Sequence, residues 1–118
     1  MTSPVLFGPY DLSERTVNRV VPRGITGAYL LGRKAAGAIK ECIILLTGRA
    51  EKDLNSELKG YIGKYDVFEY SFAYNLYEAF HIDCRNYHKL NGLAKKNNIQ
   101  HPVSPAGCGW VCPVCENQ

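Results

Sequence analysis

The chain has 118 residues, of which 46% are hydrophobic, so it can form one core and does not have the composition of a disordered chain. Its formal net charge of +3 is compatible with nucleic-acid binding and equally with an ordinary solvated surface. The longest apolar run, Cys42 to Leu46, is too short to span a membrane. The N-terminus lacks a basic start followed by an apolar run. We therefore expect a cytoplasmic protein that does not interact with membranes.

The first half of the chain predicts two strands joined by a long connection. Residues 1–23 hold three of the six prolines and indicate irregular structure. Residues 26–32 indicate a first strand, and residues 33–41, with two lysines and a glycine, indicate its connection to the next strand. Residues 42–47 form a continuous apolar run of strand length, which is typical of a central strand covered on both faces.

The second half predicts a helix, a strand and a second helix. Residues 51–62 form the first helix, with Leu54 and Leu58 four positions apart on one face. Residues 65–72 alternate apolar and polar side chains, as a half-buried strand does, and residues 76–90 form the last helix. The order β-β-α-β-α predicts an α+β fold, with a small mixed or antiparallel three-stranded sheet flanked by helices.

The last helix carries signals at both of its ends. Asn75 can cap its first turn, and Glu78, three residues later, completes a box-like pattern. Gly92 can adopt the left-handed conformation that often ends a helix. We therefore expect the helix to stop close to this glycine.

We expect one domain over residues 1–118, with a core at about 24–92 and a tail at 93–118. The tail is rich in proline and glycine and has little periodicity. Such a segment must be held by the rest of the domain or by a bound ion.

Three of the five cysteines lie in the last eleven residues and point to a metal. Cys112 and Cys115 form a C-x-x-C pair, whose spacing places two thiolates on one tetrahedral ion. A redox dithiol is the alternative, but such a pair usually opens a helix after a strand. We favour zinc because this pair stands at the end of the chain.

A tetrahedral ion needs two further ligands. Cys84 and His88 are four residues apart on the last predicted helix, so their side chains project from one face. Together with Cys112 and Cys115 they complete a Cys₃His set that ties the tail to the helix. His101 and Cys108 are the alternative ligands. With four protein ligands the site is closed, so its zinc would be structural.

Several short motifs, taken in order, resemble the GIY-YIG nuclease family. Gly27 to Tyr29 lie in the first predicted strand, and the stretch LTGRA, residues 46–50, ends the second. The helical stretch 78–88 resembles the family's second conserved helix, so that the resemblance covers about residues 24–92. Tyr61 to Gly63 spell YIG but follow the first helix, and we interpret them as a coincidence. The ending CRNYH, HPVSPAG and CPVC resembles a divergent subgroup with a cysteine-rich tail.

The resemblance implies an altered catalytic site. Tyr29 occupies the position of the tyrosine that helps to deprotonate the attacking water. Leu46 replaces the second tyrosine, and Glu57 replaces the arginine that stabilises the phosphate. Arg49 can supply a substitute cation, although from another position. Asp83 corresponds to the metal-binding glutamate and can hold Mg²⁺ or Mn²⁺.

These substitutions predict a divergent GIY-YIG-like domain that binds nucleic acid, carries a structural zinc and has impaired phosphodiesterase activity. One alternative is an active metal-dependent endonuclease of the same type, and another is a non-catalytic protein-interaction module. A cluster of basic side chains on the side near Tyr29 would support nucleic-acid binding. The candidates for this cluster are Lys34, Lys40, Arg49, Lys52 and Lys59.

Overall fold

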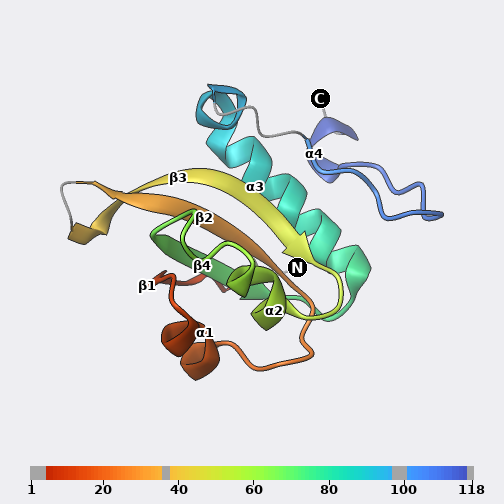
Figure 1. Cartoon of the computed structure of the whole chain (residues 1–118). Helices are drawn as coiled ribbons and strands as arrows, with labels where there is room; N and C mark the ends of the chain where they lie inside the picture. Colours follow the sequence, from red (N-terminus) through yellow and green to blue (C-terminus); the bar gives the residue numbers. More distant parts are fainter. Residues whose placement is uncertain (1–4, 36–37, 97–100, 117–118) are drawn as a thin grey trace.

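Four strands form one antiparallel sheet in the computed structural model, which describes residues 5–35, 38–96 and 101–116 (Figure 1). The strands are β1 (Phe7–Asp11), β2 (Gly27–Ala35), β3 (Ala38–Ala50) and β4 (Val67–Phe72). Their order across the sheet is β1-β4-β2-β3, and each neighbouring pair is antiparallel. The sheet therefore has one strand more than the three that the sequence predicts.

The additional strand comes from the N-terminal region, where the prediction of irregular structure was wrong. Residues 1–23 contain β1 and the helix α1 (Glu14–Val20). β1 holds Pro9 because it is an edge strand, where a missing N–H leaves no ladder bond broken. Ser13 caps α1, since its Oγ accepts a hydrogen bond of 3.2 Å from the amide of Thr16. Both elements are too short for periodicity to reveal them.

The β2–β3 hairpin is longer than predicted. β2 pairs with β4 only from Gly27 to Gly32, but it pairs with β3 as far as Ala35. The predicted connection, residues 33–41, is therefore mostly strand, with residues 36–37 outside the described part. Two contacts hold the polar side of this ribbon: Lys34 Nζ lies 3.0 Å from Asp11 Oδ1, and the Lys34 amide donates to Asp66 Oδ2 over 3.1 Å.

Three further helices follow in the order α2 (Leu54–Lys59), α3 (Leu76–Lys96) and α4 (Pro113–Glu116). From β2 to α3 the described elements thus run strand, strand, helix, strand, helix. α2 is shorter than the predicted 51–62, but Leu54 and Leu58 are fully buried, as their spacing indicates.

The predicted start of α3 is confirmed and its predicted end is wrong. Asn75 Oδ1 accepts from the Glu78 amide over 2.9 Å, while Glu78 Oε1 accepts from the Tyr74 amide over 3.0 Å. The helix runs past Gly92 to Lys96, because one glycine lowers helix propensity without ending a helix.

The helices cover both faces of the sheet. α1 and α2 lie on one face, and α3 packs against β2 and β3 on the other (Figure 1). The main core lies on the α1 and α2 side, where Val17, Leu54 and Phe68 are fully buried. A smaller cluster joins α3 to the tail: Phe80, Cys84 and Cys112, with Trp110 and Val114 against them. Two functional features result, a cleft beside α2 and a cysteine-rich centre on α3.

Candidate functional site

An open cleft of about 710 Å³ lies where the end of β3, the start of α2 and the middle of α3 meet. Four positions named from the family resemblance line it together: Tyr29, Arg49, Glu57 and Asp83. The other lining residues are Gly48, Ala50, Glu51, Lys52, Asp53 and Ser56. The fold therefore brings together residues that are up to 54 positions apart, from Tyr29 to Asp83.

Tyr29 is a buried hydrogen-bond donor at the base of the cleft. Its side chain belongs to the middle of β2, opposite Gly48 on β3, where a Cβ would collide with the tyrosine ring. Its hydroxyl donates to Glu57 Oε2 over 2.8 Å. Burial, the Tyr61 hydroxyl and the Glu57 carboxylate all raise the pKa of Tyr29 well above its ordinary value. The phenol therefore keeps its proton at neutral pH.

Tyr61 contacts Tyr29 without lining the cleft, although the sequence interpretation set it aside. It follows the C-cap of α2, as predicted, but its hydroxyl lies 3.4 Å from that of Tyr29. The two ring centroids are 5.8 Å apart. No spacing signal identifies this residue, because its contact with β2 depends on how the segment after α2 turns back over the sheet.

Arg49 is held by three separate segments. Its guanidinium lies 3.2 Å from Glu51 Oε2 in the adjoining turn and 3.4 Å from Asp83 Oδ2 on α3. Its Nη2 also donates to the Val103 carbonyl of the tail over 2.6 Å. The same group lies over the ring of Phe80, 5.5 Å from the centroid. Arg49 is therefore a partly neutralised cation with a defined position.

Asp83 is the most buried carboxylate of the cleft, with 4% of its surface exposed. Burial raises the pKa of Asp83 to about 6, although Arg49 beside it acts in the opposite direction. Its Oδ1 is buried and has no hydrogen-bond partner among the described residues. Such an orphaned oxygen suits a cation ligand, because carboxylate oxygens are the donors that Mg²⁺ and Mn²⁺ prefer.

The cleft contains more acidic than basic groups. Its lining has four carboxylates and only two cations, Arg49 and Lys52. A phosphate alone would meet a net negative field when all of these groups are ionised. A divalent cation would compensate for that charge.

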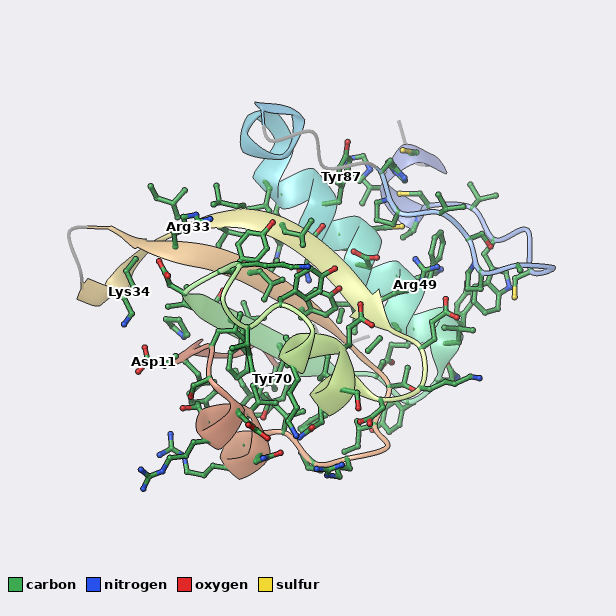
Figure 2. All side chains as sticks on the ribbon, in the orientation of Figure 1. Asp11, Arg33, Lys34, Arg49, Tyr70 and Tyr87 are labelled. Carbon is green, nitrogen blue, oxygen red and sulfur yellow. The ribbon has the colours of Figure 1, made fainter. Side chains whose placement is uncertain are left out.

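Leu46 and two of the five expected basic residues, Lys34 and Lys59, lie outside the cleft lining. Leu46 pairs with Leu31 and is partly buried against the main core, outside the cleft lining. Lys34 lies at the far end of the hairpin beside Asp11, and Figure 2 draws it on the opposite side of the molecule from Arg49. Lys59 ends α2 without lining the cleft, and the side chain of Lys40 lies outside the described residues. The described part of the chain therefore does not carry the predicted basic cluster.

Four side chains form a second site, where the tail crosses α3. The ligand atoms of His88, His101, Cys112 and Cys115 lie within 4.8 Å of one another. His88 Nε2 is 3.2 Å from His101 Nε2 and 3.4 Å from each of the two sulfurs, and Cys115 Sγ is 3.5 Å from His101 Nε2. This group can hold a metal ion.

These distances match the edges of a tetrahedron. An ion about 2.0 Å from nitrogen and about 2.3 Å from sulfur holds two nitrogens about 3.3 Å apart, and a nitrogen and a sulfur about 3.5 Å apart.

Neighbouring contacts also favour the protonation states in which His101 and Cys112 can bind a metal. His101 Nδ1 donates to the Pro102 carbonyl over 2.8 Å, which leaves Nε2 as the free lone pair facing the group. Burial opposes ionisation of Cys112, but the amides of Cys115 and Val114 outweigh it and lower the pKa of Cys112 to about 6.

The group contains three of the four predicted ligands and takes the alternative His101 in place of Cys84. Cys84 is fully buried beside Phe80, and its sulfur contacts Cys112 without belonging to the group. Burial raises the pKa of its thiol, which therefore behaves as a small apolar side chain. The other alternative, Cys108, is exposed and lies outside the group. No disulfide joins the four cysteines whose side chains are described.

Comparisons with protein-family models, with curated proteins and with solved structures found no match for this chain. The family resemblance consequently depends on the residues and on their arrangement. In the described part of the chain, none of the helices combines the length and the apolar character needed to cross a bilayer.

Proposed function

We propose that this domain binds a nucleic-acid phosphate in the Tyr29 cleft with the help of a divalent cation, and that it cleaves phosphodiesters weakly or not at all. The observation that carries this proposal is the meeting of Tyr29, Arg49, Glu57 and Asp83 in one cleft. Tyr29, Glu57 and Asp83 stand at positions that the resemblance to the GIY-YIG pattern implies are catalytic, and Arg49 is the nearby cation that can substitute for the missing arginine. An unrelated α+β domain would have no reason to bring them together.

The cation requirement follows from the charge of the cleft. Asp83 Oδ1 is the candidate ligand because it is buried and lacks a partner among the described residues. Mg²⁺ or Mn²⁺ there would offset the excess of carboxylates and give a phosphate oxygen a positive partner. Arg49, whose guanidinium lies 3.4 Å from Asp83 Oδ2, would supply the second positive contact beside the cation.

Weak cleavage follows from the state of the other two groups. Tyr29 keeps its proton, so it is a poor acceptor for a proton from water. Glu57 adds negative charge where transition-state stabilisation needs a cation. Leu46 does not line the cleft and contributes no polar group in place of the family's second tyrosine.

We also propose that the ion held by His88, His101, Cys112 and Cys115 is a structural zinc. A set of two thiolates and two imidazoles favours Zn²⁺ over Mg²⁺ or Ca²⁺. Four protein ligands leave no open position, so this ion would stabilise the tail and take no part in hydrolysis.

A titration tests the binding proposal. Fluorescent single-stranded, duplex and branched oligonucleotides are titrated at low salt, with and without Mg²⁺ or Mn²⁺. We expect binding that tightens at least several-fold with the cation in the wild type and not in Asp83→Asn. The proposal fails if no oligonucleotide binds below about 0.1 mM, the weak end of ordinary non-specific affinity.

One observation favours the protein-interaction alternative. Tyr74 is 94% exposed, and Tyr77 and Val111 are also exposed, around the start of α3. Exposed aromatic and aliphatic side chains of this kind occur at protein interfaces. If the oligonucleotides fail to bind, this face becomes the leading candidate for function. The active-endonuclease alternative gains support only if the same oligonucleotides are cleaved with turnover that Asp83→Ala abolishes.

A further inference from the structure

Arg49 is the link between the two sites. It is the one cation of the cleft whose contacts, among the described residues, include both α3 and the tail. The shortest of these contacts is the bond of 2.6 Å from Nη2 to the Val103 carbonyl. A charge-assisted hydrogen bond restrains the orientation of the Arg49 side chain, which is itself only 14% exposed. The tail therefore determines where the guanidinium points.

The metal group determines the position of that carbonyl. Val103 stands two residues after His101, one of the four grouped side chains. The residue between them is Pro102, whose ring fixes φ and whose carbonyl accepts from His101 Nδ1 over 2.8 Å. The step from His101 to Val103 is consequently stiff. Figure 2 shows Arg49 on the side of the molecule where the tail crosses α3.

The other side of the metal group is anchored on α3. His88 lies on the same helix as Asp83, the second partner of Arg49. An ion bound by His88 and His101 would thus fix the distance between α3 and residues 101–103. The two segments that hold Arg49 would be tied together close to the guanidinium itself.

Apart from the metal group, the ring contact of His101 with Tyr87 of α3, with centroids 5.0 Å apart, holds residues 101–103 against the helix. The apolar contacts of the tail involve Trp110, Cys112 and Val114, which follow the segment. Val103 itself is 70% exposed. Loss of the ion would remove the tether between His88 and His101, and the segment would then separate from α3 and Arg49 more readily.

We infer that the metal centre positions Arg49 for phosphate binding through the His101–Pro102–Val103 segment. Metal occupancy would then set the affinity of the cleft as well as the stability of the tail. This inference rests on the proposed phosphate-binding function of the cleft.

The experiment monitors the Arg49 side chain by NMR and measures the affinity for an oligonucleotide separately. The Nε–Hε resonance of Arg49 is identified in ¹⁵N spectra by its absence in Arg49→Lys. Wild type, His101→Ala and Pro102→Gly are compared, all as full chains. Metal content comes from elemental analysis, and affinity from titration of a fluorescent single-stranded oligonucleotide with Mg²⁺.

We expect His101→Ala to lose the metal, shift or broaden the Arg49 resonance and bind the oligonucleotide about tenfold more weakly, as loss of one charge-assisted hydrogen bond implies. Pro102→Gly keeps all four ligands, so it should keep the metal. Because it frees the backbone between His101 and Val103, it should still perturb the Arg49 resonance and weaken binding about threefold. Ala106→Gly, which frees the backbone at an exposed position elsewhere in the tail, serves as the matched control and should behave as wild type.

A metal-loaded Pro102→Gly variant with the wild-type Arg49 resonance and affinity would overturn the inference. This result remains decisive even if His101→Ala fails to fold. Failure of the proposed function looks different: the wild type then binds no oligonucleotide, while the Arg49 resonance still reports whether the tail positions the side chain.

Discussion

The Tyr29 hydroxyl donates a 2.8 Å hydrogen bond to Glu57, so the residue that resembles a catalytic tyrosine is held as a neutral donor. A lowered pKa would require a cation near the phenol, and the nearest charged partner is a carboxylate. The phenol is also buried between β2 and α2, which opposes its ionisation further. The arrangement suits recognition of an oxygen acceptor better than removal of a proton from water.

Reversal of the charge at position 57 should therefore strengthen phosphate binding in the cleft. In Glu57→Arg a cation replaces the carboxylate beside Tyr29, which should lower the pKa of the phenol and attract phosphate. We expect oligonucleotide affinity to rise about tenfold and any residual plasmid cleavage with Mn²⁺ to increase. Glu14→Arg, an exposed change of the same charge on α1, is the control for net charge. Equal gains in both variants would mean that the position of the cation is irrelevant.

Arg49 should contribute to phosphate binding without reading sequence. Arg49→Ala should weaken binding to different oligonucleotides about equally, because phosphate contacts carry no base information, and affinity should fall as salt rises. Lys34→Ala removes an equal charge at the far end of the hairpin and should have a much smaller effect. Titrations at two salt concentrations measure both variants. A loss in Arg49→Ala that is confined to one sequence would contradict this role.

The raised pKa of Asp83 predicts a pH-dependent stability. With a folded pKa of about 6 against an ordinary value of 3.8, the folded chain holds this proton longer than the unfolded chain as pH rises. As pH rises from about 4 to about 6, Asp83 should therefore progressively reduce the free energy of unfolding, by about 3 kcal/mol in total, and the full reduction persists above that range. Asp83→Asn does not titrate and should escape this loss. Denaturant unfolding at pH 4.5 and 7 without divalent cations measures the difference. If the free energy of unfolding changes between these two pH values by the same amount in both proteins, the pKa of Asp83 is not raised.

The metal should depend on His101 and be independent of Cys84. We expect one zinc per chain in purified protein, lost in His101→Ala and retained in Cys84→Ser, because only His101 lies with the other three ligand atoms. Cys108→Ser should also retain the metal, since this thiol is exposed and outside the group. Elemental analysis after extensive dialysis measures the number of zinc ions per chain in each variant. If Cys84→Ser loses the metal and His101→Ala retains it, the ligands are instead the four predicted from helical spacing: Cys84, His88, Cys112 and Cys115.

Local patterns in the sequence were sufficient for much of the fold. The helical spacing of Leu54 and Leu58 predicts the face that α2 buries, and the Asn75–Glu78 pattern predicts the start of α3. The alternation in residues 65–72 predicts β4. These features were predictable because each depends on residues within one or two turns of helix or along one strand. The C-x-x-C pair is local in the same sense, and both of its cysteines belong to the metal group.

Only the tertiary structure decided which of these local features meet. Spacing places Cys84 and His88 on one face of α3, but the path of the tail brings His101 to His88 and leaves Cys84 buried against Phe80. Tyr61 reaches Tyr29 because the chain after α2 folds back over the sheet. Contacts of this kind join segments whose separation in the sequence carries no periodic signal. The packing of whole elements against each other determines them, and that packing depends on the side chains of every layer at once.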